Sequence, residues 1–363
     1  MASAKVRYAV IGAGNIAQVA VLPSFQHARE NSQLVALVSG DAEKRSALCE
    51  RYELEISGDY EELEQVLERG NVDAVYVATP NSEHREYALR AARCGIHVLC
   101  EKPLAPTVAE CQQMADTCAD ANVRLMVAYR LHFEEANLSA IEIVQSGRLG
   151  EPRIFDSVFT HVVRPGDIRE RPELAGGAVL DLGVYCINAA RNLFRDEPVL
   201  VLATAQFRDG VDETTSALLQ FPHGRVAQFT VGNSCASVSS YRVTGSDGNL
   251  RVEPAYDYAG KLEHHLTIDE KTSTKSFGKR DQFAAQIAYF SRCILVGEEP
   301  EPSGDEAICD LRVVEAILKS AQTGMPVPLA PWHRRRRPSM SQESKKPPLR
   351  KPEPIQAPSP SLK

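Results

Sequence analysis

The 363-residue chain carries 41 Lys and Arg against 48 Asp and Glu, a formal net charge of −7, and 43% of it is hydrophobic. This length favours two domains, and the composition is typical of a globular protein with a large core. The acidic balance argues against DNA as the main ligand, and no apolar run is long enough to cross a bilayer. We therefore expect no membrane partner and no specific nucleic-acid partner.

Nine cysteines are scattered singly, without CxxC pairs or histidines at metal-ligand spacing. This usage favours reduced thiols over disulfides, and we predict no metal site. The first strand begins within a few residues of the N-terminus, so no apolar secretory segment is expected. Together these features predict a cytoplasmic protein.

The first 130 residues alternate short apolar runs with amphipathic stretches. Such alternation predicts an α/β domain with a doubly wound parallel sheet, which we place at residues 1–130. The apolar runs expected to form buried strands are residues 6–11, 34–38, 74–78, 96–100 and 125–128.

The sequence GAGNIA directly follows the first of these strands. Gly12 and Gly14 match the first two glycines of the GxGxxG/A dinucleotide motif, Asn15 and Ile16 follow, and Ala17 fills the third position. Gly12 permits a tight turn, and Gly14 lets a pyrophosphate approach the backbone. The next helix would direct its N-terminus at the phosphates, so this segment predicts a dinucleotide site.

The second predicted strand ends at Ser39, where an enzyme that prefers NAD usually carries an acid. Ser39 does not repel a 2′-phosphate, and Lys44 and Arg45 lie close enough in the chain to pair with one. Two points argue against a 2′-phosphate site: Asp41 is a nearby acid, and both cations could be solvated side chains that bind no ligand. We predict NADP in preference to NAD.

After residue 150 the chain is rich in β-forming runs, several joined by hairpin signals such as His223-Gly224 and Asp247-Gly248. Helical patterns return only at residues 281–297 and 305–322. We predict a second, α+β domain at residues 131–330, built on a mainly antiparallel open sheet. Some of its outer helices are expected to pack back toward the first domain.

The sequence GGAVLDLGVYCIN, residues 176–188, combines an acid and a phenol in an otherwise apolar stretch. Asp181 and Tyr185 are four residues apart, so a helix would place them on one face with Cβ atoms roughly 5–6 Å apart. The pair could be a satisfied buried hydrogen bond or the acid–base end of an active site.

Three further stretches, VATPNSEH, CEKPLA and AYRLHFEEAN, follow the carboxyl ends of predicted parallel strands, where ligands of open α/β sheets bind. With the glycine motif and GGAVLDLGVYCIN, they make residues 5 to 330 resemble the Gfo/Idh/MocA family, which includes glucose–fructose oxidoreductase and inositol dehydrogenase. The resemblance implies a Rossmann domain, a sheet-based substrate domain and dehydrogenase activity. It also implies subunit pairing through the second sheet, as a homodimer or homotetramer.

The resemblance also implies roles for individual residues. Lys102 would lie between the nicotinamide and the substrate hydroxyl, on a cis-proline-like turn. Tyr185 stands where many relatives carry histidine, as in the branch that resembles glucose–fructose oxidoreductase and the NADP-dependent aldose and dihydrodiol dehydrogenases. The residues implied around the cofactor or the lysine loop are Thr79, Pro80, Asn81, His84, Glu101, Lys102 and Arg130.

Hydride transfer between carbon and nicotinamide needs a matched proton transfer at the attached oxygen. A phenol titrates near 10, but a neighbouring ammonium and a positive nicotinamide ring favour the phenolate. We predict Tyr185 as the proton relay, Lys102 as its electrostatic partner and Asp181 as the group that positions a sugar hydroxyl.

Weaker candidates lie in the second domain. Arg164 could contact substrate or belong to a plain surface loop, and Asn188 is a further candidate substrate contact. His132 and His161 are expected to be structural. We expect four cysteines to pack in the core: Cys94, Cys100, Cys186 and Cys293.

Residues 331–363 hold nine Lys or Arg, two acids and almost no large apolar residue. Such a segment cannot bury enough surface to offset its ordering entropy, so it predicts a disordered basic tail. A solvated tail is favoured over one that touches nucleic acid or membrane.

These features predict an NADP-dependent oxidoreductase acting on a sugar or polyol, an aldose such as glucose or xylose. One alternative is a trans-dihydrodiol-type dehydrogenase. Another, of a different class, is a non-catalytic dinucleotide-binding regulator, which would have no need to keep Lys102, Asp181 and Tyr185 together.

Overall fold

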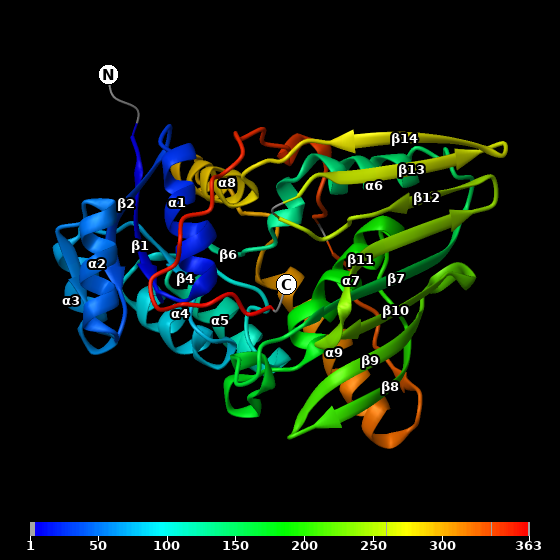
Figure 1. Ribbon diagram of the computed structural model, residues 1–363, viewed down its shortest axis with the longest axis horizontal. Coiled ribbons are helices and arrows are strands. Elements are labelled where there is room, and N and C mark those ends of the chain that lie inside the picture. Colours follow the sequence, from blue (N-terminus) through cyan, green and yellow to red (C-terminus); the bar gives the residue numbers. More distant parts are fainter. Residues whose placement is uncertain (1–3, 259, 335, 362–363) are drawn as a thin grey trace. The chain divides into compact units, whose positions relative to one another are not determined.

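The computed structural model describes residues 4–258, 260–334 and 336–361, and the chain divides into two compact units (Figure 1). The first unit contains residues up to 130, 280–307 and 345–360; the second contains 131–279, 308–344 and 361. Residues 1–3 of the first predicted domain and residues 335 and 362–363 of the predicted tail lie outside the description.

The first unit contains a six-stranded parallel sheet in the order β3-β2-β1-β4-β5-β6. This order places a topological switch point between β1 and β4, where ligands of open sheets bind at the carboxyl ends. Buried apolar side chains fill these strands on both faces, which is why they read as continuous apolar runs. The strands are β1 (Val6–Ile11), β2 (Ser32–Val38), β3 (Ile56–Gly58), β4 (Ala74–Val77), β5 (His97–Cys100) and β6 (Leu125–Val127).

Helix α8 packs against β1 and β2 of the first unit. Its Ser291 hydroxyl is hydrogen bonded to the Tyr8 hydroxyl at 2.8 Å and to the Ser32 hydroxyl at 2.7 Å. Residues 280–307 therefore belong to the first unit and not to a continuous second domain at 131–330. The helices of the first unit are α1 (Leu22–Ser24), α2 (Ala42–Tyr52), α3 (Leu63–Arg69), α4 (His84–Arg93), α5 (Val108–Asp120) and α8 (Gln282–Val296).

The second unit contains a nine-stranded sheet in the order β14-β13-β12-β11-β7-β10-β9-β8-β15. Only the β7–β10 pair is parallel among the described strands, so the prediction of a mainly antiparallel sheet is confirmed. The strands are β7 (Pro152–Val162), β8 (Leu200–Arg208), β9 (Val211–Gln220), β10 (Val226–Gly232), β11 (Ser234–Gly245), β12 (Gly248–Val252), β13 (Leu262–Ile268), β14 (Lys271–Phe277) and β15 (Val327–Pro328).

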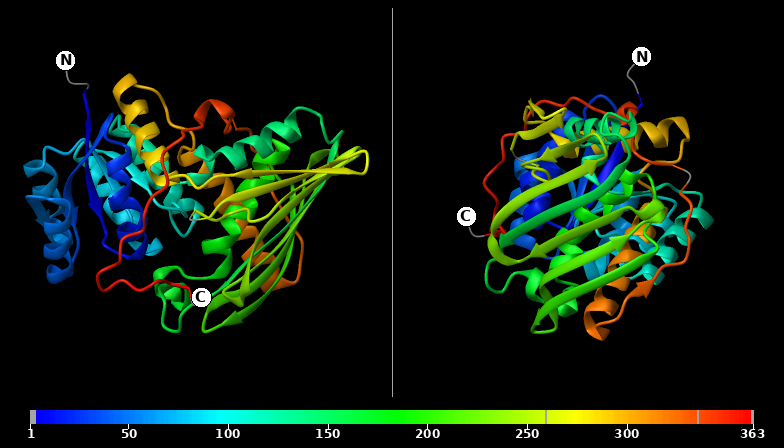
Figure 2. Two further views of the ribbon diagram at one scale, coloured as in Figure 1. Left: turned by 45° about the horizontal axis from the view of Figure 1, so that its top comes forward. Right: turned by 90° about the vertical axis from the view of Figure 1, so that its right-hand side faces the viewer.

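Helices cover one face of this sheet: α6 (Glu135–Gln145), α7 (Val184–Phe194) and α9 (Gly304–Thr323) (Figure 2). The Ser320 hydroxyl of α9, for example, accepts a hydrogen bond from the backbone N–H of Ala203 in β8 at 2.9 Å. The other face carries exposed apolar side chains on several strands. They include Ile154, Val158, Leu202 and Leu218.

The tail, residues 331–361 as far as described, contains a single short 3₁₀ turn at Met340–Gln342. It makes contacts nonetheless. Arg337 binds Glu197 in the second unit, and in the first unit the Ile355 N–H donates to Gln18 Oε1 at 2.7 Å. Disorder of this segment in solution stays a prediction. Within the described residues, no helix is long and apolar enough to span a bilayer.

Candidate active site

The glycine turn after β1 has the geometry that the sequence motif predicts. Gly12 has φ 102°, and a Cβ there would lie 2.6 Å from the Ala78 carbonyl oxygen. Gly14 is exposed, and a Cβ there would meet no heavy atom within 4 Å. One glycine therefore permits the turn and a close packing contact, while the other leaves its backbone open to a ligand. The helix begins with a π-helical turn, Ala17–Val21.

The tail contacts the residues that follow Gly14. The Asn15 side-chain amide donates to the Ala357 carbonyl at 2.8 Å. Gln18 accepts from the Ile355 N–H and donates to the Ile355 carbonyl at 3.0 Å. Ile16 is half-buried between them. The structure thus uses the Asn15 amide, a predicted cofactor contact, for the tail.

Lys44 and Arg45, the two cations predicted to select NADP, lie close to the end of β2. Ser39 is buried, and the Arg45 guanidinium donates to its carbonyl. Lys44 Nζ lies 3.4 Å from Asp41 Oδ2, and Arg45 Nη1 lies 4.0 Å from Asp59 Oδ2. Both cations are mostly shielded from solvent and close to the strand end, although each also has an acid beside it.

The loop after β4 contains a buried hydroxyl and a buried imidazole. Thr79 Oγ1 has no hydrogen-bond partner among the described residues. His84 Nδ1 lies 2.9 Å from the Pro103 carbonyl oxygen, and Nε2 lies 3.0 Å from that of Thr79. Burial lowers the pKa of His84. His84 is fully buried and therefore joins the loops after β4 and β5, and its place beside the cofactor stays a prediction. Pro80 and Asn81 lead into α4.

The loop after β5 presents Lys102, followed by the predicted cis bond to Pro103. The preceding Glu101 is buried and accepts a hydrogen bond from the Tyr76 hydroxyl at 2.7 Å. Gln286 of α8 donates to that hydroxyl, also at 2.7 Å. Burial raises the pKa of Glu101, and the Tyr76 hydrogen bond and the Lys102 charge oppose the rise. A chain of hydrogen bonds therefore anchors the base of the lysine loop.

Arg130 is also buried in the first unit. Its guanidinium donates to Gln282 Oε1 at 2.5 Å, at the start of α8, and its charge lowers the pKa of Glu101. Arg130 therefore supports the loop that carries Lys102, one of the two roles that the sequence suggests.

In the second unit, Asp181 lies in a π-helical turn, Val179–Gly183, that continues into α7. Arg169 Nε donates to Asp181 Oδ2 at 2.5 Å, and His161 Nε2 lies 3.8 Å from the same oxygen. Burial opposes the charge of Arg169, but the carboxylates of Asp181 and Asp167 raise its pKa overall. Arg169 thus holds the Asp181 side chain in a fixed position.

Tyr185 occupies the first turn of α7, and its residue surface is 9% exposed. Its ring lies edge-on to Phe159, with centroids 5.7 Å apart, and 6.0 Å from the ring of Tyr256. These aromatic side chains restrict the position of the phenol. Asp181 and Tyr185 thus begin the same helical segment, as predicted, although its first turn is π-helical and not regular α-helix.

Asp212 was not predicted from the sequence. Its Oδ2 accepts from the Val179 N–H at 2.9 Å and from the Thr215 hydroxyl at 2.8 Å, so it holds the first turn of the Asp181 segment. Burial raises its pKa to about 6, and these hydrogen bonds oppose the rise. Asp212 lies on a β-strand 31 positions after Asp181, so no local sequence pattern links the two residues. Arg169 was not predicted either, because the sequence indicated Arg164 as the candidate substrate contact in the same loop.

Several weaker predictions change. Asn188 is buried and donates to Asp310 Oδ2 at 2.9 Å, while its carbonyl oxygen lies 2.8 Å from His132 Nε2. We withdraw Asn188 as a substrate contact, because its amide is engaged inside the unit, and His132 is structural as expected. Arg164 is exposed.

Cys94 is exposed at the end of α4, whereas the predicted core cysteines 100, 186 and 293 are buried.

Comparison with known proteins places these features in a family. Residues 6–129 match the model of an oxidoreductase family with an NAD-binding Rossmann fold. Residues 138–251 match the GFO/IDH/MocA C-terminal domain. The chain belongs to the Gfo/Idh/MocA oxidoreductase family. The resemblance drawn from the sequence and the predicted fold class are both confirmed.

Named relatives of this family member include sugar and diol dehydrogenases. The D-xylose 1-dehydrogenase (NADP(+)) 2 of Haloferax volcanii is 34% identical, over 89% of this chain and 99% of its own length. The trans-1,2-dihydrobenzene-1,2-diol dehydrogenase of Mus musculus is 30% identical over 68% of this chain and 74% of its own. A crystal structure of aldose–aldose oxidoreductase from Caulobacter crescentus, complexed with glycerol, has a TM-score of 0.85 and 37% identity. The match covers 90% of this chain and 100% of the Caulobacter crescentus chain.

Proposed function

We propose that this protein is an NADP-dependent oxidoreductase that transfers a hydride between nicotinamide and a hydroxyl or carbonyl group of a sugar or polyol. We propose aldoses such as glucose or xylose as its substrates. The observation that carries the proposal is the helical segment that presents Asp181, paired with Arg169, one turn before Tyr185. The relatives named for NADP-dependent xylose oxidation and for aldose oxidoreduction support the substrate class.

The residues of the first unit fit NADP. The open backbone at Gly14 would accept the pyrophosphate, and Lys44 and Arg45 would pair with the 2′-phosphate. The buried Thr79 hydroxyl, which has no partner among the described residues, is a polar group that a bound ligand would satisfy. When bound, the cofactor would donate or accept the hydride.

The proton transfer falls to residues of this chain. Tyr185 would relay the proton between the substrate oxygen and solvent, held by its aromatic neighbours. Lys102 would act beside the nicotinamide, and the Asp181 carboxylate would accept a hydrogen bond from a substrate hydroxyl. Arg169 would fix the position of Asp181 while it does so.

The deciding experiment follows the reduction of NADP⁺ by nicotinamide absorbance with a panel of aldoses and polyols. Wild-type protein should turn over at least one sugar, and Tyr185→Phe should lower kcat by about 10² or more, because it removes the proton relay. Tight NADPH binding without turnover of any panel member would contradict the proposal and favour the dinucleotide-binding regulator.

The mouse relative supports a second candidate, a trans-dihydrodiol-type dehydrogenase. The two candidates share the cofactor and the residues Lys102, Asp181 and Tyr185, so mutation of these residues does not separate them. A direct comparison does: kcat/KM should be higher for xylose or glucose than for a cyclic trans-dihydrodiol. The reverse order would establish the second candidate.

Two further proposals concern the setting of the enzyme. The exposed apolar face of the nine-stranded sheet supports pairing of subunits as a homodimer or homotetramer. The nine cysteines, none in a disulfide within the described residues, support a reducing compartment such as the cytoplasm.

A further inference from the structure

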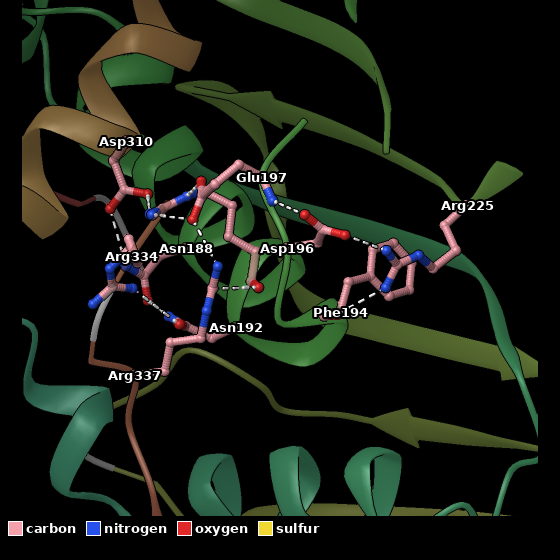
Figure 3. Close-up of polar contacts among 10 residues, drawn as sticks. Asn188, Asn192, Phe194, Asp196, Glu197, Arg225, Asp310, Arg334 and Arg337 are labelled. Carbon is pink, nitrogen blue, oxygen red and sulfur yellow. Dashed lines mark hydrogen bonds and ion pairs between the residues drawn. The ribbon is translucent and has the colours of Figure 1, made fainter. Parts of the chain in front are cut away.

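A buried ion cluster fixes the C-terminal half of α7 within the second unit (Figure 3). Arg191 is fully buried and binds both oxygens of Glu197, with Nε 2.5 Å from Oε2 and Nη2 3.0 Å from Oε1. Its Nη1 forms an ion pair with Asp310 of α9. Asn188, one turn earlier, donates to the same carboxylate. The last turns of α7 are thereby attached to α9 and to the segment that follows α7.

A cation from the tail also belongs to this cluster. Asp310 is 0% exposed and Glu197 is 8% exposed, so both carboxylates beside Arg191 are buried. A buried carboxylate that loses a cationic partner strongly destabilises a protein. Arg337 of the tail supplies such a partner, because its Nη2 lies 2.9 Å from Glu197 Oε1.

The same arginine contacts the backbone of α7. Arg337 Nη1 donates to the Arg191 carbonyl at 3.0 Å, close to the end of the helix, where the helix dipole favours a cation. Arg334 adds a second contact, from Nη1 to Asn192 Oδ1 at 3.3 Å. Figure 3 shows both tail arginines directed at the same end of α7.

We infer that Arg337 is a positioning residue: it neutralises Glu197 and fixes the C-terminal end of the helix that carries Tyr185. The inference rests on the proposed function for the role of Tyr185, but not for the ion cluster. It gives Arg337, one residue of the basic tail, a function inside the protein. Arg337 completes a buried salt-bridge network, which is a different role from a solvated arm or a nucleic-acid contact.

Thermal unfolding of the full-length chain tests the structural part. Arg337→Ala should lower the Tm by about 4 °C or more, and Arg337→Lys should recover part of that loss, since it keeps the charge but not the paired donors. The matched control is Arg350→Ala, which removes the same charge from an exposed position of the tail. Equal Tm values for Arg337→Ala and Arg350→Ala would overturn the inference.

A double-mutant cycle tests the stated cause. If Arg337 acts by neutralising Glu197, then Arg337→Ala should lower the Tm less in a Glu197→Gln background than in the wild type. Glu197→Gln weakens its bond to Arg191 in both backgrounds, so that cost cancels in the comparison. Additive Tm shifts would show that the two side chains act independently, and would overturn the inference.

Kinetics test the link to Tyr185. Arg337→Ala should lower kcat for the preferred sugar about 5-fold to 10-fold, with KM for NADP⁺ unchanged because the nucleotide loops belong to the first unit. Arg350→Ala should change neither. A kcat equal to that of Arg350→Ala would overturn the positioning role. Absence of turnover in the wild type would instead refute the proposed function, and the unfolding cycle would still decide the ion cluster.

Discussion

Asp181, proposed to position substrate, is held in place by a partly exposed cation. The Arg169 guanidinium donates to its Oδ2 at 2.5 Å and so fixes the direction of the carboxylate. At the residue scale, the proposed site therefore depends on supporting side chains as much as on the residues that would touch substrate.

The support from Arg169 can be tested directly. Arg169→Met keeps much of the side-chain volume but removes the charge and the donors, so Asp181 should lose its fixed position. We expect KM for the sugar to rise about 10-fold or more, with KM for NADP⁺ unchanged. The control is Arg171→Met, at an exposed position of the same loop. Steady-state kinetics that cannot distinguish the two variants would refute the role of Arg169.

We propose that single residues also decide the cofactor preference. Lys44→Ala with Arg45→Ala removes both cations at the end of β2 and should raise the Kd for NADPH about 10-fold to 100-fold, while the Kd for NADH changes little. Only the 2′-phosphate distinguishes the two ligands. Fluorescence titration of both cofactors provides the measurement, and equal weakening of both would contradict the assignment.

At the scale of elements, the helix after the glycine motif and the helix that carries Tyr185 both begin with a π-helical turn, Ala17–Val21 and Val179–Gly183. Such turns are often found at functional sites, and they need stabilisation from outside the helix. Asp212 supplies it for the second segment, through the Val179 N–H. The acid that stabilises this segment thus comes from a β-strand of the neighbouring sheet.

This arrangement predicts a pH dependence of stability. Burial raises the pKa of Asp212 from 3.8 to about 6, so the folded state binds more protons than the unfolded state between these values. The free energy of unfolding should therefore fall as pH rises from 4 to 6, by roughly 2 kcal/mol from this group. Asp212→Asn cannot ionise and should lack that fall. Urea unfolding of both proteins at pH 4 and pH 7 measures it, and parallel pH profiles would contradict the assignment.

The glycine turn gives a second prediction at this scale. Gly12→Ala would place a methyl group 2.6 Å from the Ala78 carbonyl oxygen, in a backbone conformation at φ 102° that L residues rarely adopt. NADPH binding should fall by about 100-fold or more in a fluorescence titration. Gly297→Ala is the control, because Gly297 has φ 76° but open space around its Cβ position. Normal binding by Gly12→Ala would show that the turn is not needed.

At the scale of the whole molecule, the nine-stranded sheet is covered by helices on one face only. Leu202 and Leu218 are cross-strand partners on the uncovered face, and Ile154 and Val158 lie on β7. A group of exposed apolar residues close together on one face of a sheet is typical of an interaction surface. We propose that a second copy of the chain binds this uncovered face.

Light scattering tests this assembly at micromolar concentration. The wild type should behave as a dimer or a tetramer, and Leu218→Lys should shift it toward monomer, because the change introduces a charge into the apolar face. Leu295→Lys, at an exposed apolar position of α8, is the control and should leave the mass unchanged. A monomeric wild type would refute the proposal.

The sequence by itself determined the parallel sheet, the glycine turn, the family and the pairing of Asp181 with Tyr185 on one helical segment. Local patterns suffice for these features, because buried strands need continuous apolar runs and a tight turn needs glycine. The tertiary structure decided the environment of each side chain. It enclosed His84 and Asn188, joined Arg169 to Asp181, brought Asp212 to the start of the segment and placed Arg337 on Glu197. Each of these outcomes depends on residues distant in the chain, and no local pattern encodes which distant charges meet.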